Sequence, residues 1–258
     1  MTLENLGFDS SLLGAPLVAG LLVASTHVVL GRKVLERGII FIDISIAQVA
    51  ALGSIVGATL GLTPPEGGGW QGQIAAGIAA LLASGLLAWT ERRLRFVQEA
   101  LIGSLYVIAA SAALLVLASN PHGAEHMQEL LAGQILWIGF TQVWPVATLY
   151  AGILAVWFLW ARRQPAAFYF LFAFTVMASV QLVGVYLVFA TLILPALAAH
   201  GMPERAGLAV GYAVGAAGYA LCLWLSVPLD LPAGPLIVCV LAALALLTAI
   251  GRRLLRSG

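Results

Sequence analysis

The sequence predicts an all-α fold, a polytopic membrane helical bundle of about nine segments that forms a single transmembrane domain over residues 1–258. Hydrophobic residues make up 62% of the chain and charged residues 9%, and the mean hydropathy is +1.02. A water-soluble domain carries roughly a quarter charged residues, so this chain has too little polar surface for a soluble globule. The formal net charge of +1 offers no basic patch for nucleic acid. A soluble enzyme, a nucleic-acid binder and a disordered chain are therefore excluded, and membrane lipid is the expected surroundings.

Apolar runs long enough to cross about 30 Å of hydrocarbon, at roughly 20 residues each, follow one another along the chain. They cover residues 11–30, 38–62, 74–90, 99–118, 136–160, 166–199, 206–227 and 235–250. As one helix, the run 166–199 would be about 51 Å long, which exceeds the membrane core even with a large tilt. We therefore expect it to break near residues 181–184 into two shorter segments, which makes nine in all.

The positions of the basic residues favour this count. With nine segments and the N-terminus outside, all twelve basic residues fall in cytoplasmic connections and the outer loops hold none. They are Arg32, Lys33, Arg37, Arg92, Arg93, Arg95, Arg162, Arg163, Arg205, Arg252, Arg253 and Arg256. A single span over 166–199 would move the last four of them outside. The positive-inside rule thus predicts nine segments and a cytoplasmic C-terminus in a multi-pass protein of the cell (inner) membrane.

The connections contain residues that end helices. Residues 63–69 and 120–123 combine proline with glycine, and 228–235 holds three prolines. No connection is long or polar enough for a second, soluble domain.

Asp43 is the most informative polar residue. It lies about a turn and a half into the second segment, where a carboxylate is costly and usually marks an ion path, a proton relay or a buried pair. A hard carboxylate suits a divalent cation, and His27 offers a nitrogen ligand at a matching depth in the first segment. The alternatives are structural. Asp43 pairs with Arg32 or Arg37 near the cytoplasmic surface, and His27 bonds to helix backbone.

Two amides, Gln48 and Gln181, are expected to be buried in the bundle. Such amides more often connect helices than bind a ligand. Gln48 lies about 140° around an ideal helix from Asp43, so the two side chains do not share a face.

A second cluster lies in an outer loop and contains His122, Glu125, His126 and Glu129. On a helix these four residues would share one face, which suits clustered nitrogen and oxygen ligands. The string from His122 to His126 also matches the HxxEH pattern of some zinc peptidases. The alternatives are an outward-facing metal contact, a peptidase site and a solvated helix face.

Sequence patterns for ATP binding or hydrolase chemistry are absent. There is no Gly-rich loop followed by lysine, and no GxSxG string. Cys222 and Cys239 lie in apolar runs without CxxC spacing. The chain is therefore expected to be no enzyme, and any ATP hydrolysis is expected in a partner subunit.

Five strings in order resemble the zinc/manganese/iron ABC-importer permeases (the ABC-3 family). The most characteristic is QLVGVYLVFATLILPALAA at 181–199, and the second is residues 37–57 with Asp43 and Gly53. The others are EALIG at 99–103, LLAGQIL at 130–136 and DLPAGPLIV at 230–238. The resemblance covers roughly residues 11–250.

The resemblance implies an all-helical permease that forms a homodimer, sits on two cytoplasmic ABC ATPase subunits and receives a divalent cation from an extracytoplasmic metal-binding protein. It also implies a metal path through Asp43. The glycines Gly207, Gly211, Gly215 and Gly218 would permit the close approach of helices. No cofactor is expected to stay bound, because the metal is cargo.

Two features depart from the family's pattern. A histidine usually follows the aspartate by one turn, whereas Ala47 occupies that position here and Gln48 is the nearest polar residue. The cytoplasmic loop that helps to dock the ATPase is very short here, at residues 161–166.

Our interpretation is the permease subunit of an ATP-driven importer of divalent metal ions, zinc or manganese, with iron as a further candidate. The metal ligands would come from Asp43, His27, Gln48, His122, Glu125 and His126. One alternative is an ATP-independent metal carrier on the same scaffold. Another is a membrane metallopeptidase that uses His122, Glu125 and His126.

Overall fold

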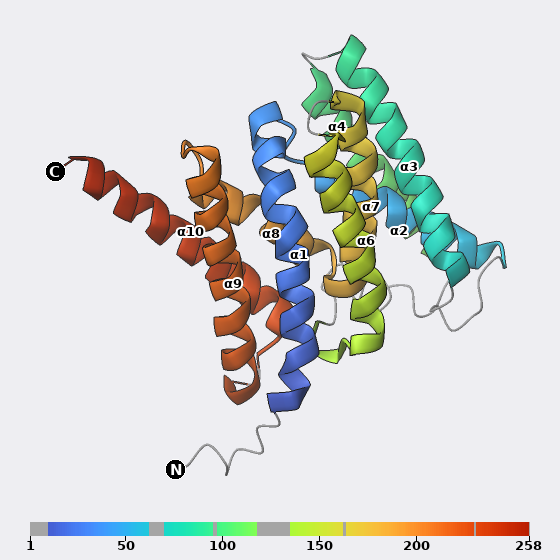
Figure 1. Cartoon of the computed structure of the whole chain (residues 1–258). Coiled ribbons are helices and arrows are strands. Elements are labelled where there is room, and N and C mark those ends of the chain that lie inside the picture. The colour runs from blue at the N-terminus through green and yellow to red at the C-terminus, as the bar shows by residue number, and fades with distance from the viewer. Residues whose placement is uncertain are drawn as a thin grey trace. The chain divides into compact units, whose positions relative to one another are not determined.

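The computed structural model describes residues 10–61, 70–94, 97–117, 135–161, 164–229 and 231–257. These residues form nine α-helices and the short 3₁₀ helix η3, with no strand among them (Figure 1). The all-α prediction is thus confirmed for this part of the chain. The elements are α1 (Ser10–Arg37), α2 (Ile42–Thr59), α3 (Trp70–Arg93), α4 (Gln98–Leu117), η3 (Ile135–Trp137), α6 (Phe140–Leu159), α7 (Pro165–Val183), α8 (Val185–Ala198), α9 (Glu204–Leu229) and α10 (Ala233–Ser257).

The predicted break in the long apolar run is confirmed. Helix α7 ends at Val183, Gly184 follows with a φ of 81°, and α8 begins at Val185. Glycine adopts this left-handed backbone without the penalty that a Cβ atom would bring. In the described part of the chain, eight helices are long and apolar enough to cross a membrane, whereas α8 has 14 residues. Helix α8 is therefore about 21 Å long, and this ninth segment is shorter than a full span.

Several helices extend past the apolar runs that predicted them. Helix α1 continues to Arg37 and α10 to Ser257, so both include basic residues beyond their apolar stretch. The hydropathy pattern marks the part of a helix that lies in hydrocarbon, and the backbone stays helical beyond it.

The described residues pack into two compact units. Unit 1 lies within Met1–Glu36, Ala132–Tyr150 and Leu182–Gly258, and unit 2 lies within Arg37–Leu131 and Ala151–Gln181. Whether the two units act as one permease domain stays a prediction.

In unit 1, α8, α9 and α10 pack against one another, and α9 also contacts α1. A Cβ atom on Gly211 would come within 2.6 Å of a Val28 methyl carbon on α1, and one on Gly218 would clash with the side chain of Leu241 on α10. The side chain of Tyr219 is fully buried, and its hydroxyl lies 2.7 Å from the Thr191 hydroxyl of α8. The glycines of α9 therefore permit the predicted close approach of helices within the chain.

In unit 2, α2 packs on α3 and α4. A Cβ atom on Gly53 of α2 would lie 2.8 Å from the carbonyl oxygen of Ala75 on α3, so the two backbones approach closely. One end of the unit is tied together by Arg37. Its guanidinium lies 3.4 Å from a Glu91 carboxylate oxygen at the end of α3 and 4.4 Å from the centre of the Phe168 ring near the start of α7.

Basic residues in unit 1 also gather at one end. Arg32 donates to the carbonyl oxygens of Ala199 and Met202, at 3.4 and 3.2 Å. Arg252 donates to the carbonyl oxygens of Ala198 and His200, at 2.8 and 3.1 Å. The ends of α1, α8 and α10 therefore meet. This agrees with the prediction that Arg32 and Arg252 lie on the same side of the membrane. Which side of the membrane this is stays a prediction.

Cysteine labelling tests the predicted orientation. In a background with Cys222 and Cys239 replaced by alanine, Arg205→Cys should resist an impermeant thiol reagent added to intact cells. Glu66→Cys, in a predicted outer loop, should react with it, and Arg205→Cys should react after the membrane is opened. Labelling of position 205 from outside would contradict the nine-segment topology.

Candidate functional site

Asp43 lies in the first turn of α2, two residues after the N-terminal capping position at Phe41. Only 1% of its surface is exposed, and neither of its carboxylate oxygens has a hydrogen-bond partner among the described residues. The positive end of a helix favours a negative charge, but a buried carboxylate without a partner is costly. A bound cation would supply the missing interaction.

The predicted structural alternative for Asp43 finds no support in these contacts. Arg37 forms an ion pair with Glu91, and Arg32 donates to two backbone carbonyl groups in unit 1. Since both oxygens of Asp43 lack a hydrogen-bond partner among the described residues, Arg37 does not neutralise it through a hydrogen bond. Pairing with Arg32, which belongs to unit 1, stays a prediction.

His27 is fully buried in α1. Its Nδ1 atom lies 2.9 Å from the carbonyl oxygen of Val23 and 3.1 Å from the hydroxyl of Thr26, both on its own helix. The backbone contact matches the structural alternative for this residue. Donation from Nδ1 would leave the lone pair on Nε2, which is the arrangement found in many metal-ligating histidines. His27 belongs to unit 1 and Asp43 to unit 2, so a shared metal ion stays a prediction.

The two amides differ in their surroundings. Gln48 on α2 is 3% exposed, as predicted. The prediction that Gln181 is buried is wrong, because its side chain is exposed on α7 just before the break at Gly184. The apolar neighbours of Gln181 in the sequence indicated that it lies within the membrane. They do not show which face of the helix its side chain occupies.

The predicted outer cluster of His122, Glu125 and His126, with Glu129, lies outside the described residues. Its role stays a prediction. Within either unit, the described residues contain no group of three or more His, Cys, Asp and Glu side chains placed to hold a metal ion.

Glu99 is not among the predicted site residues, although it begins the family string at 99–103. It lies in the first turn of α4, and its Oε1 atom accepts a hydrogen bond of 3.3 Å from the backbone N–H of Phe41. The Oε2 atom is buried and has no hydrogen-bond partner in the described chain. An acid in the first turn of a helix is common, so nothing in the sequence distinguished this one.

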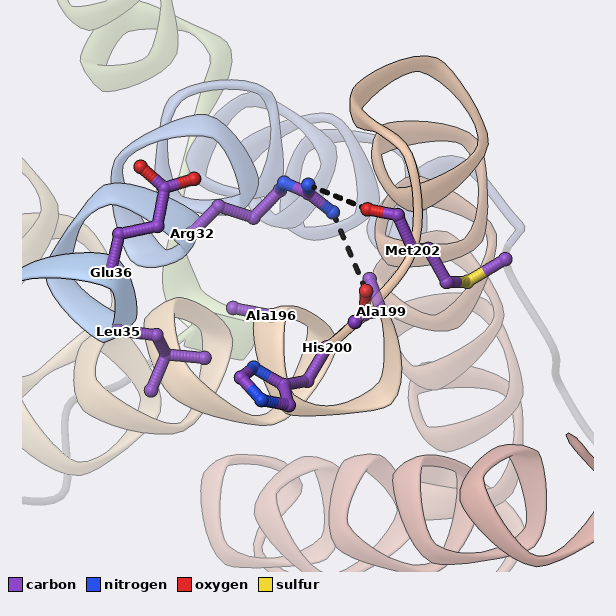
Figure 2. Close-up of a pocket in the computed structure, with 8 residues that line it drawn as sticks. Arg32, Leu35, Glu36, Ala196, Ala199, His200 and Met202 are labelled. Carbon is purple, nitrogen blue, oxygen red and sulfur yellow. Dashed lines mark hydrogen bonds between the residues drawn. The ribbon is translucent and has the colours of Figure 1, made fainter. Parts of the chain in front are cut away.

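A pocket of about 190 Å³ lies beside the turn between α8 and α9. Figure 2 shows the guanidinium of Arg32 crossing from α1 to the carbonyl groups of Ala199 and Met202. The pocket is lined by Arg32, Leu35, Glu36, Ala196, Ala199, His200, Gly201 and Met202. It therefore combines apolar walls with an acid and an imidazole at the basic end of unit 1.

The family of the chain follows from its sequence. A model of the ABC 3 transport family matches residues 10–170 and 164–252. The chain therefore belongs to the ABC 3 transport family, as its five strings indicated. Its permease subunits are multi-pass membrane transport components and not ATPases, and ATP hydrolysis lies in a separate subunit. Comparison with curated protein sequences returns no match.

Two solved structures share the fold. PsaBC from Streptococcus pneumoniae, in complex with a Fab, superposes with a TM-score of 0.72 at 18% identity, over 92% of this chain and 90% of that chain. A chain described as a metal-chelate type ABC transporter, in an inward-facing conformation, gives a TM-score of 0.68 at 15% identity, over 92% of this chain and 85% of the other. At these identities the likeness concerns the fold alone.

Proposed function

We propose that this chain is the permease subunit of an ATP-driven importer of a first-row divalent cation, zinc, manganese or iron, in the cell (inner) membrane. The observation that carries the proposal is Asp43, a buried carboxylate without a hydrogen-bond partner in a membrane helix. Family membership and the similarity to a metal-chelate type transporter support it.

Asp43 would act as a ligand that replaces part of the cation's hydration shell. Removing a divalent ion from water is unfavourable unless charged or polar ligands compensate. In the low dielectric of the membrane core, one carboxylate attracts a cation far more strongly than it would in water. His27 and Gln48 remain the further ligands that we propose from the sequence.

The proposed assembly is a homodimer that binds two cytoplasmic ABC ATPase subunits and takes its cargo from an extracytoplasmic metal-binding protein. Because the connection at 161–166 is very short, we place the ATPase contact at the turn between α8 and α9. The carbonyl groups of this turn are held by Arg32 and Arg252. A turn held in this way can pass a displacement on to α8, and the adjacent pocket offers space for a partner side chain.

Removal of the Asp43 charge should stop transport without unfolding the protein. We expect Asp43→Asn to lower metal uptake by about tenfold or more, at normal expression and with an unchanged melting temperature, because no hydrogen bond to the described chain is lost. Uptake of radioactive zinc and manganese into cells measures this, with Asp9→Asn as the matched control. Normal uptake by well-expressed Asp43→Asn would refute the metal role.

Cross-linking locates the ATPase contact. In the cysteine-free background, His200→Cys should cross-link to the ATPase subunit, whereas Gln164→Cys in the short 161–166 connection should not. The reverse result would contradict the placement at the α8–α9 turn. A chain that transports metal into liposomes without ATP would favour the ATP-independent carrier.

The outer cluster should tune uptake and catalyse nothing. Replacing His122 and His126 by alanine should raise the metal concentration needed for half-maximal uptake by several fold, because two weak ligands for the arriving cation are lost. The maximal rate should change less. Unchanged uptake would make these residues an ordinary solvated face, and protease activity that disappears in Glu125→Gln would instead establish the metallopeptidase.

A further inference from the structure

The carboxylate of Asp43 is not oriented by a hydrogen bond from any described residue. Carboxylates that bind metals are usually held by such bonds, and a ligand must stand within about 0.5 Å of its productive place. The place of Asp43 therefore depends on its packing and on the backbone that carries it, which is the first turn of α2. The contacts that fix this turn in unit 2 then influence how well a cation is bound.

A short elbow, residues 38–41, connects Arg37, the last residue of α1, to the first turn of α2. Gly38 has a φ of 68°, a left-handed conformation that lets the chain turn directly after Arg37. The backbone N–H of Ile42 donates to the carbonyl oxygen of Ile39 at 3.2 Å and closes the elbow. Because the elbow is so short, a contact that fixes its start also restricts the helix that follows.

Arg37 ties the start of the elbow to two other helices of unit 2. Its Nη1 atom lies 3.4 Å from a carboxylate oxygen of Glu91 at the end of α3, and the two side chains are 16% and 22% exposed. Its guanidinium also lies over the rings of Phe168 and Tyr169 near the start of α7, at 4.4 and 5.7 Å from the ring centres. Attraction to the rings adds to the ion pair, so one side chain connects α1 with α3 and α7.

The rings under Arg37 belong to a buried aromatic cluster. Phe168 stacks on Phe172 with 5.3 Å between ring centres. It meets Tyr169 and Trp157 edge to face, at 5.5 and 6.1 Å. Phe168, Tyr169 and Phe172 are fully buried, and Trp157 of α6 is 5% exposed. Closely packed side chains have little room to move, so the cluster gives the guanidinium a firm support.

We propose that Arg37, held by Glu91 and Phe168, is a positioning residue for the metal ligand Asp43. This inference rests on the proposed role of Asp43 in metal transport. Arg37 fixes the start of the elbow, and the hydrogen bond from the Phe41 N–H to Glu99 fixes its end at 3.3 Å. The first turn of α2 is thus held from α3, α7 and α4, and Arg37 acts on the cation only through the backbone that carries Asp43.

Positioning and simple electrostatics predict opposite effects when the charge of Arg37 is removed. A positive charge repels a cation, so its loss alone would raise the affinity for a metal ion. Loss of the contacts that fix the elbow would instead lower the affinity, because the carboxylate of Asp43 is then placed less well. The direction of the change therefore decides between the two.

Mn²⁺ binding to the purified full chain in lipid nanodiscs tests the proposal, with free Mn²⁺ measured by electron paramagnetic resonance. Arg37→Gln should lower the affinity for Mn²⁺ by about tenfold. Arg37→Lys keeps the charge but loses the planar group, so it should lower the affinity by a smaller factor. Glu36→Ala is the matched control. It removes a 2.8 Å ion pair with Lys33 that lies within α1 and ties no second helix, and Mn²⁺ binding should stay unchanged.

A double substitution shows whether Arg37 acts through Asp43. Asp43→Asn should lower the affinity for Mn²⁺ on its own. Adding Arg37→Gln to it should then change the affinity by less than about twofold, because residues that act through one another are not additive. A full further loss of about tenfold would mean that Arg37 acts elsewhere, and the inference would be wrong.

The outcomes separate this inference from the proposed function. If Arg37→Gln lowers the melting temperature but binds Mn²⁺ as well as or better than the unchanged chain, Arg37 only stabilises the fold, while metal transport stands. If Arg37→Gln does not fold, Arg37→Lys decides, because its charge is unchanged and normal binding would contradict positioning. If the unchanged chain binds neither Mn²⁺ nor Zn²⁺, the proposed function itself fails.

Discussion

Helix ends leave backbone groups without a partner in their own helix, and this constraint acts in both units. In unit 1, the carbonyl groups at the end of α8 accept hydrogen bonds from within the chain. Arg32 and Arg252 supply them from α1 and α10. In unit 2, the backbone N–H group of Phe41, at the cap that precedes α2, donates to the carboxylate of Glu99. These end contacts connect α2 and α8 to neighbouring helices.

At the candidate site, by contrast, buried side-chain oxygen atoms lack hydrogen-bond partners within the described chain. The backbone N–H groups of Phe41, Ile42 and Ser45 at the start of α2 have partners, while both side-chain oxygens of Asp43 lack one among the described residues. A chain selected for stability alone would be expected to fill such positions with apolar residues. The cation that we propose as cargo would give the oxygens of Asp43 the partner that they lack.

The helices could be predicted from the sequence because hydrocarbon thickness and charge placement are physical constraints that act along the chain. The break before α8 follows from the length of one apolar run and the side required for Arg205. Burial around a helix axis is different, since uniformly apolar helices show no periodicity from which to assign a face. Gln181 was therefore misplaced. Glu99 was overlooked because its importance depends on a contact with Phe41, far away in sequence.

The two hydrogen bonds of Arg32 have a consequence for which substitutions the protein tolerates. During membrane insertion only the positive charge at this position matters, and lysine would supply that charge equally well. The turn after α8 needs a planar group that donates in two directions at once, which lysine cannot reproduce. Biogenesis and folding thus impose different demands on one side chain, and only the demand from folding distinguishes arginine from its neighbour Lys33.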